Sequence, residues 1–198
     1  MKHLTAAFLF TVSFAVASTA QKDNKNNITS KWAVSLSHGL FTIPEIFNVV
    51  GAVVTPATPQ PYSNNRFFGA SFITLRRNTK KNKFWYGLTA GFDPVRGQYR
   101  DDVPPGTFRM KIFTFAAEAQ WTYSSLPKLR AYGFAGGGLA WGVIKRTGGD
   151  GKRSDEKIRS MNFQLTPVGV SFGRKYGWFA ELGFGYKGII NMGGYVRF

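Results

Sequence analysis

The sequence GWFAELGFGYKGIINMGGYVRF occupies residues 177–198 and decides the fold. Over 178–186 every second residue is apolar, and the positions between them hold a phenylalanine, Glu181 and two glycines. Residues 190–198 alternate in a similar way and end on Phe198. Because successive side chains of a β-strand point to opposite faces, this stretch predicts two strands joined by a tight turn. Each has one apolar face and one face that is mostly polar or small.

The same alternation recurs upstream, in segments that are rich in glycine and aromatic residues and are separated by turn-forming residues. It slips in phase at Pro167 and near Gly136, which indicates bulges or bends. The pattern predicts eight strands, over about 31–38, 66–76, 84–99, 108–123, 130–145, 159–173, 178–186 and 190–198.

The N-terminus indicates export. Lys2 precedes a mostly apolar run over 4–17, and small residues precede Gln21. This order is typical of a secretory signal peptide, and we expect cleavage after Ala20; a retained N-terminal anchor is the alternative. The expected organisation is a signal peptide over 1–20, a flexible lead-in over 21–30 and a barrel over 31–198.

The composition restricts the chemistry. The chain has no cysteine, which excludes disulfides, thiol catalysis and Cys-based metal sites. After the N-terminal run no segment approaches the roughly 20 apolar residues of a spanning helix, so a membrane-spanning fold has to be a closed barrel. The formal charge is +16. In an exported protein this charge favours anionic lipid headgroups or surface polysaccharide as partners, rather than nucleic acid.

The strand plan and the C-terminal sequence resemble the small outer-membrane β-barrel family, the OmpA/OmpX-type eight-stranded barrels. The resemblance extends over about 31–198. It implies an all-β, antiparallel transmembrane barrel, integral to the outer membrane of a Gram-negative bacterium, that is monomeric and holds no cofactor. Tyr195, Val196 and Phe198 resemble the C-terminal signal that the barrel-assembly machinery reads in this family, which makes that machinery an expected partner beside outer-membrane lipid and lipopolysaccharide.

Two carboxylates fall near the middle of predicted strands, Glu118 and Glu181, and their phase places both in the lumen. An ionised carboxylate in a narrow lumen needs partners. An eight-stranded barrel is just wide enough for its side chains to fill, so we expect a structural network; a gated ion pathway is the alternative. Arg130 and Asn162 are further candidates on the lumen faces. The predicted lumen network consists of Glu118, Gln120, Gln164, Glu181, Asn191 and Arg197.

The connections after the first, third and fifth predicted strands are longer than the others. Since outer-membrane barrels have short periplasmic turns and longer outer loops, both termini are expected in the periplasm. Basic residues cluster over 76–83, expected in a periplasmic turn, and over 145–159, expected in an outer loop. The second cluster is a candidate contact for phosphorylated lipopolysaccharide, and solvated loop charge is the alternative.

Catalysis has little support in the sequence. A Ser/His/Asp site needs all three groups in hydrogen-bond register, and His38 has no distinctive pairing with Ser63, Ser154 or the aspartates at 101–102. We therefore predict no catalytic, cofactor-binding or metal-binding residues. The predicted function is a non-enzymatic outer-membrane barrel with a structural or surface-interaction role. The alternatives are a small pore or transporter, an accessory barrel of a secretion or motility system and, less favoured, a lipid-modifying enzyme.

Overall fold

A computed structural model describes most of the chain from residue 31 onward, and the predicted signal peptide and lead-in lie outside the described residues. The described ranges are 31–42, 63–67 (backbone only), 69–79, 83–98, 106–126, 128–148 and 151–198. The strands are β1 (Trp32–Leu40), β2 (Ser63–Phe67), β3 (Ala70–Asn78), β4 (Phe84–Gln98), β5 (Thr107–Ser125), β6 (Leu129–Thr147), β7 (Arg153–Gly173), β8 (Tyr176–Gly185) and β9 (Ile190–Arg197). In the part of the chain that the structure describes, no helix has the length and hydropathy needed to cross a membrane.

The strands close into a ring in which every neighbouring pair is antiparallel. The order around the ring is β1, β3, β4, β5, β6, β7, β8 and β9, and β9 pairs with β1. The short β2 continues the line of β3 along β4: β3 pairs with β4 as far as Phe92, and Phe67 in β2 pairs with Val95. The ring therefore has eight strand positions, and the predicted eight-stranded antiparallel barrel is confirmed.

The second predicted strand has the wrong boundaries. The strand expected over 66–76 is divided, because Gly69 adopts a φ of 69° between β2 and β3. An extended strand cannot pass through this left-handed conformation. The barrel strand β3 therefore begins at Ala70 and continues to Asn78.

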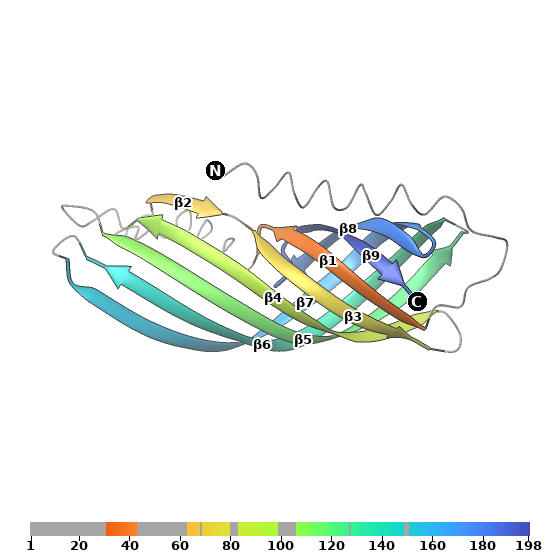
Figure 1. Cartoon of the computed structure of the whole chain (residues 1–198), viewed down its shortest axis with the longest axis horizontal. Helices are drawn as coiled ribbons and strands as arrows, with labels where there is room; N and C mark the ends of the chain where they lie inside the picture. Colours follow the sequence, from red (N-terminus) through yellow and green to blue (C-terminus); the bar gives the residue numbers. More distant parts are fainter. Residues whose placement is uncertain are drawn as a thin grey trace.

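Four strands continue beyond the ring. β5, β6 and β7 have 19, 19 and 21 residues, whereas β8 and β9 have 10 and 8. Figure 1 shows β4 to β7 projecting to the left as a curved sheet, with the C-terminus at the opposite end. We call this projecting sheet the wing and define it as residues 93–98, 107–112, 142–147 and 153–158, which pair in register.

The wing corrects the prediction of a charged outer loop. Most of the cluster over 145–159 is strand, and β7 begins at Arg153 rather than at 159. The backbone pairing of β6 with β7 places charged side chains opposite each other. Lys145 Nζ, for example, lies 3.9 Å from Asp155 Oδ2. Opposite charges placed across two strands stabilise a sheet, which is why the charged segment extends β6 and β7.

The ring is apolar outside and polar inside. Leu88 of β4, on the exterior, is 67% exposed, whereas Phe179 of β8, on the interior, is 4% exposed. The exterior includes aromatic residues at both ends of the ring, such as Trp141 toward the wing and Trp178 toward the termini. Buried polar side chains line the interior, and they include Thr74, Thr89, Thr114, Glu118, Gln164, Glu181 and Asn191.

Of the two predicted phase slips, the one at Pro167 has a counterpart in the register and the one near Gly136 has none. The pairing of β7 with β8 shifts between Leu165 and Val168, across Pro167. The pairing of β6 with β7 shifts opposite the same place, because three steps of β7 from Thr166 to Gly169 face two steps of β6, whereas Gly136 pairs regularly with Glu118 and Gln164. Tyr132 and Phe134 are two residues apart on the same face of β6, and both are buried inside the barrel.

Candidate functional site: the barrel lumen

Glu118 on β5 lies at the centre of the lumen and is fully buried. Its Oε2 accepts a hydrogen bond from Arg76 Nη2 at 2.7 Å. Its Oε1 accepts hydrogen bonds from Thr89 Oγ1 at 2.6 Å and from Tyr186 O–H at 2.8 Å, and it forms an ion pair with Lys187 Nζ. One carboxylate thus contacts two cationic side chains and accepts hydrogen bonds from two hydroxyl groups.

Glu181 on β8 forms the second half of the network. Its Oε1 accepts a hydrogen bond from Tyr132 O–H at 2.7 Å, and its Oε2 accepts one from Asn191 Nδ2 at 2.6 Å. Arg76 Nη2 is 4.0 Å from Glu181 Oε1, so this guanidinium connects the two carboxylates. Two negative and two positive side chains therefore balance inside the barrel, as burial of charge requires.

Aromatic rings pack around the two cations. The ring of Phe134, which is completely buried, lies 5.2 Å from Arg76 Cζ and 4.8 Å from Lys187 Nζ, measured to its centroid. The rings of Phe72 and Tyr186 pack 5.9 Å apart next to them. We call these side chains, with Glu118, Glu181, Thr89, Tyr132 and Asn191, the central cluster. They fill the middle of the lumen with salt bridges and rings.

A glycine beside the central glutamate makes the arrangement possible. Arg76, Gly87 and Glu118 are in register on three adjacent strands. A Cβ on Gly87 would lie 2.1 Å from Leu75 O and 2.8 Å from Arg76 Cγ. The arginine side chain therefore passes over a position that only glycine can occupy, and it reaches the carboxylate two strands away.

Arg76 and Lys187 were not among the predicted lumen residues. Arg76 was assigned to a basic periplasmic turn, but β3 continues two residues past it, and its position alternates with the buried Thr74. The period of two from Phe72 onward is the sequence signal that identifies Arg76. For Lys187 no such signal exists, because it lies in a turn.

The turn between β8 and β9 folds into the barrel. Gly185 and Gly188 have φ values of 145° and 85°, which favour glycine. Gln164 Oε1 accepts a hydrogen bond from the backbone N–H of Lys187 at 2.7 Å, which holds the turn inward. Tyr186, expected on the outer face, is for this reason buried beside Lys187.

The six predicted network residues occupy two places. Glu118, Gln164, Glu181 and Asn191 belong to the central cluster or contact it directly. Gln120 and Arg197 instead line a cavity of about 30 Å³ on the side of the C-terminus.

Among the described residues, the contacts of Arg197 lie away from the two glutamates. Its Nη2 donates to Ser171 Oγ at 3.3 Å, its Nη1 donates to Arg174 O at 3.4 Å, and its guanidinium lies 4.1 Å from the Tyr195 ring. Arg197 therefore lies outside the central cluster, and Arg76 is the arginine that binds Glu118.

The C-terminal residues close the ring. Phe198 exchanges two backbone hydrogen bonds with Trp32, of 2.9 and 3.0 Å, and its side chain is 59% exposed on the apolar exterior. Tyr195 points inward, and its O–H donates to Gly173 O at 2.9 Å. Val196 pairs with Val34 of β1. Recognition of these residues by an assembly machine stays a prediction.

The candidate catalytic residues do not form a described site. His38 Nδ1 lies 3.2 Å from Ser71 Oγ, and Ser154 lies at the distant end of the wing. The aspartates at 101–102 lie outside the described residues, and so does the side chain of Ser63. Within the described ranges no group of three His, Cys, Asp or Glu residues is placed to hold a metal ion.

A closed antiparallel ring, an apolar exterior with aromatic ends and a charged interior define a transmembrane β-barrel. Side chains fill the lumen of this barrel, as is typical of eight strands. The structure is therefore that of a small eight-stranded membrane barrel, an architecture typical of outer-membrane proteins.

No protein-family model matches the sequence, and no curated protein matches it. Among solved structures, the N-terminal β-barrel domain of Pseudomonas aeruginosa OprF is 15% identical, with 85% of this chain and 98% of that chain covered and a TM-score of 0.45. Ail, the attachment invasion locus protein of Yersinia pestis, is 11% identical, with 85% and 96% covered and a TM-score of 0.41. A further structure of Ail, in complex with the heparin analogue sucrose octasulfate, is 12% identical, with the same coverage and a TM-score of 0.41.

Proposed function

We propose that this protein is a non-enzymatic outer-membrane barrel with a surface-interaction role, in which the outward face of the wing binds the phosphate groups of lipopolysaccharide. The observation that carries the proposal is the order of side chains along that face. Basic residues occupy the far rows, and aromatic residues occupy the rows next to the ring.

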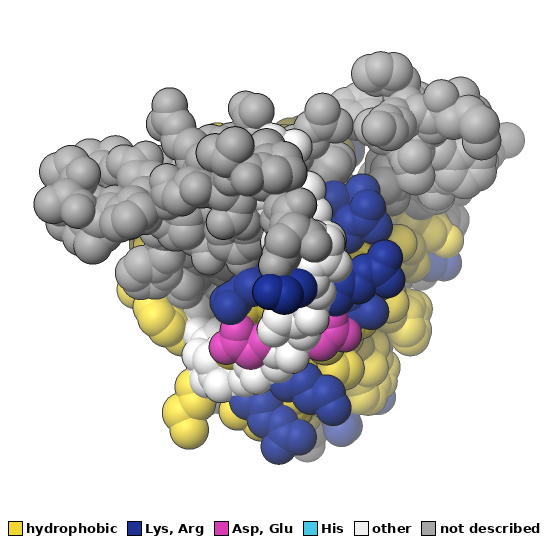
Figure 2. Space-filling model, turned by 90° about the vertical axis from the view of Figure 1, so that its left-hand side faces the viewer, with side chains coloured by type: hydrophobic (Ala, Val, Ile, Leu, Met, Phe, Trp, Pro, Cys, Tyr) yellow, Lys and Arg dark blue, Asp and Glu magenta, His cyan; other side chains and the backbone are white. Residues whose placement is uncertain are grey.

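The basic rows follow from the strand register. Arg96, Arg109 and Lys145 lie side by side on three adjacent strands. Lys111 and Lys157 lie on the same face, one row closer to the ring. All five side chains are exposed. Figure 2, viewed from the wing end, shows Lys and Arg side chains gathered on this end with few acidic ones between them.

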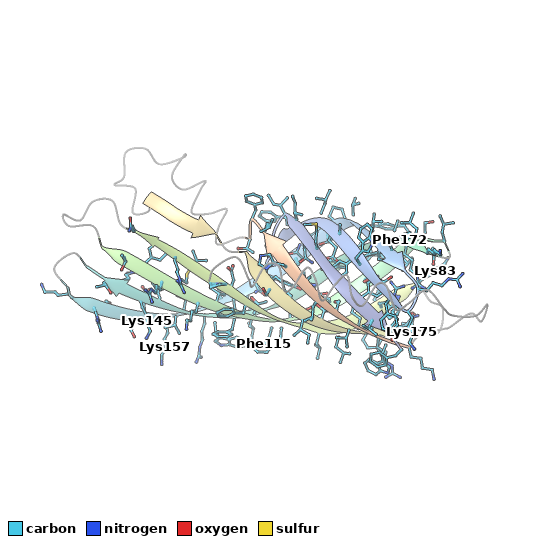
Figure 3. The ribbon with its side chains drawn as sticks, turned by 45° about the horizontal axis from the view of Figure 1, so that its top comes forward. Lys83, Phe115, Lys145, Lys157, Phe172 and Lys175 are labelled. Atoms are coloured by element: carbon cyan, nitrogen blue, oxygen red, sulfur yellow. The ribbon has the colours of Figure 1, made fainter. Side chains whose placement is uncertain are left out.

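A row of aromatic residues lies next to the basic rows, on the side of the ring. Phe92, Phe113 and Trp141 are in register below the lysines. The rings of Phe92 and Phe113 are 5.1 Å apart, and those of Phe115 and Trp141 are 5.6 Å apart. Figure 3 shows Lys145 and Lys157 toward the wing end, Phe115 nearer the middle, and Lys83 and Lys175 at the opposite end.

This order matches the layers of an outer leaflet. Aromatic side chains favour the boundary of the hydrocarbon, and anionic headgroups lie just beyond it. The Lys145–Asp155 pair weakens the field only slightly, because both side chains are more than half exposed and surface pairs contribute little. The face is therefore suited to phosphate, which arginine and lysine bind through charge-assisted hydrogen bonds.

The triple variant Arg109→Gln, Lys111→Gln and Lys157→Gln is expected to bind lipopolysaccharide more weakly. Each basic group near an anionic surface contributes about 1 kcal/mol, so the loss is about 3 kcal/mol, or roughly a hundredfold in affinity. The measurement is binding of purified lipopolysaccharide to the barrel in nanodiscs, with intact and enzymatically dephosphorylated lipid.

The matched control changes Lys83, Lys128 and Lys175 to Gln at the end that holds the C-terminus. All three are exposed, so the control removes the same charge from the opposite rim. We expect its affinity for lipopolysaccharide to stay near that of the wild type. Equal losses in both variants, or no preference for the phosphorylated lipid, would contradict the proposal.

Surface binding requires that the wing lies outside the cell. The chain has no cysteine, so Lys152→Cys in the turn at the wing end and Lys175→Cys at the opposite end give single labelling sites. An impermeant maleimide is expected to label intact cells at position 152 and to label position 175 only after the outer membrane is permeabilised. The reverse pattern would show that the orientation is inverted.

A further inference from the structure

One layer of the lumen lies between the central cluster and the C-terminal end of the barrel. It is the cavity of about 30 Å³ that Gln120 and Arg197 line. Each of the eight strand positions of the ring contributes at least one residue to its wall, so the cavity lies inside the barrel, and Arg76 belongs both to this wall and to the central cluster. A water molecule takes up about 30 Å³ in the liquid, so the space accommodates a single small ion rather than an organic group.

Arg197 brings a buried positive charge into this cavity. The residue is 8% exposed, and it forms no salt bridge with the described residues. Ser171 Oγ and Arg174 O, at 3.3 and 3.4 Å, use two of the five N–H donors of the guanidinium. Stacking on Tyr195, at 4.1 Å from the ring centroid, fixes the plane of the guanidinium. The other N–H groups lie in that plane and remain for a ligand that accepts hydrogen bonds.

Arg76 supplies a second donor to the same wall. Its Nη2 binds Glu118 at 2.7 Å, whereas its Nε–H is buried and has no hydrogen-bond partner among the described residues. Ser35 and Gln120, both buried, add a hydroxyl and an amide group. Neither Glu118 nor Glu181 is among the described residues that line the cavity. A buried donor without an acceptor is unfavourable, so this wall favours a ligand that accepts hydrogen bonds.

The charge of Arg197 comes in addition to a balanced network. The charges of the central cluster already compensate each other, so a further buried cation makes this layer of the lumen positive. Arg130 lies on the same inner face as Tyr132 and pairs in register with Ser171 of the cavity wall, which adds a second, half-buried guanidinium. In surroundings of low dielectric, two such charges attract an anion strongly.

We propose that this cavity binds a small inorganic anion of about the size of chloride. The Arg197 guanidinium supplies the opposite charge, and the Nε–H of Arg76 and the hydroxyl of Ser35 donate hydrogen bonds from β3 and β1. A halide accepts hydrogen bonds and carries the compensating charge, whereas a bound water would leave the charge of Arg197 uncompensated. The anion thereby extends the charge-balanced network of the lumen from the central cluster to the C-terminal layer.

The test uses the full barrel in nanodiscs and follows the amide signals of Ser35 and Ser171 by NMR. Sodium chloride is titrated against sodium gluconate at constant ionic strength, because gluconate is too large for the cavity. We expect saturable shifts with chloride and none with gluconate, and at least tenfold weaker chloride binding to Arg197→Gln. Lys83→Gln removes one exposed charge from the same end of the barrel and should bind chloride within about twofold of the wild type, since salt screens an exposed charge.

A second variant keeps both arginines and fills the space. Ser35→Val is expected to abolish saturable chloride binding, because its methyl groups occupy the cavity and a donor is lost. It decides the question if Arg197→Gln fails to insert, which heat-dependent gel mobility reports. An anion that binds only the folded barrel also raises its unfolding temperature in chloride relative to gluconate, and this gain should be lost in Ser35→Val.

Three outcomes would overturn the proposal. The first is absence of saturable chloride binding to the wild type, which would mean that the cavity holds water only. The second is an equal response to gluconate. The third is full chloride binding to Arg197→Gln or to Ser35→Val.

Discussion

Glu118→Ala is expected to lower the free energy of unfolding of the barrel by about 3–5 kcal/mol. The substitution leaves Arg76 and Lys187 in the lumen with only Glu181 to balance them, and Arg76 Nη2 is already 4.0 Å from that carboxylate. A buried cation without a partner is costly, since the lumen wall cannot replace the lost ion pair. Heat-dependent gel mobility and chemical unfolding in lipid vesicles measure the change.

Two further variants show whether charge balance is the cause. The double variant Glu118→Gln and Lys187→Met removes one positive and one negative charge together, so Arg76 and Glu181 remain as a balanced pair. We expect it to recover much of the lost stability, because replacing both members of a buried pair is often close to neutral.

The second control is Glu156→Ala on the wing. Its partner Arg146 is 2.9 Å away, but both side chains are more than 40% exposed, so the loss should stay within about 1 kcal/mol. If Glu118→Ala unfolds together with the wild type, the central cluster does not stabilise the barrel and the charge-balance explanation is wrong.

The faces of the strands were predictable from sequence because they depend on neighbouring residues alone. Successive side chains of a strand point to opposite faces. The apolar neighbours of Glu118 and Glu181 face the lipid, so both glutamates are placed in the lumen. The same reasoning applied to β3 would have placed Arg76 beside Thr74. It was missed because the strand was ended too early, at the first pair of basic residues.

The partners of the glutamates were less predictable, because they depend on the stagger of strands far apart in the chain. Arg76 and Glu118 meet because Gly87 holds the same row between them. Lys187 reaches Glu118 because two glycines with positive φ turn a short connection inward. An alternating pattern contains no information about a turn that folds into the lumen, so Arg197 was a reasonable but incorrect partner.

The wing also shows that strand pairing is difficult to predict from the sequence. The basic residues over 145–159 were read as a loop because charge and glycine are typical of loops. In the structure this segment pairs across β6 and β7, and Lys145 lies in one row with Arg109 of β5 on the face that we propose binds phosphate. The basic residues are evident in the sequence, but only the register of the strands places them together on one face.

Deletion of Phe198 is expected to reduce the membrane-inserted fraction of the protein strongly, with unassembled chain left in the periplasm. This expectation rests on the resemblance of Tyr195, Val196 and Phe198 to a C-terminal assembly signal. Until β9 pairs with β1, both strands have unpaired edges, and such edges are an aggregation hazard. Prompt recognition of the last strand would remove that hazard.

The geometry offers a simpler role for the same residue, and the two roles predict different failures. Phe198 is 59% exposed on the apolar exterior, so as a lipid-facing side chain it contributes at most about 1.5–3 kcal/mol. Loss of that area alone should give a correctly inserted barrel of slightly lower stability. Phe198→Tyr retains an aromatic terminus and serves as the control, with insertion measured at low expression by heat-dependent mobility of the outer-membrane fraction. Full insertion of the deletion variant would defeat the assembly-signal hypothesis, whereas periplasmic accumulation of the deletion variant but not of Phe198→Tyr would support it.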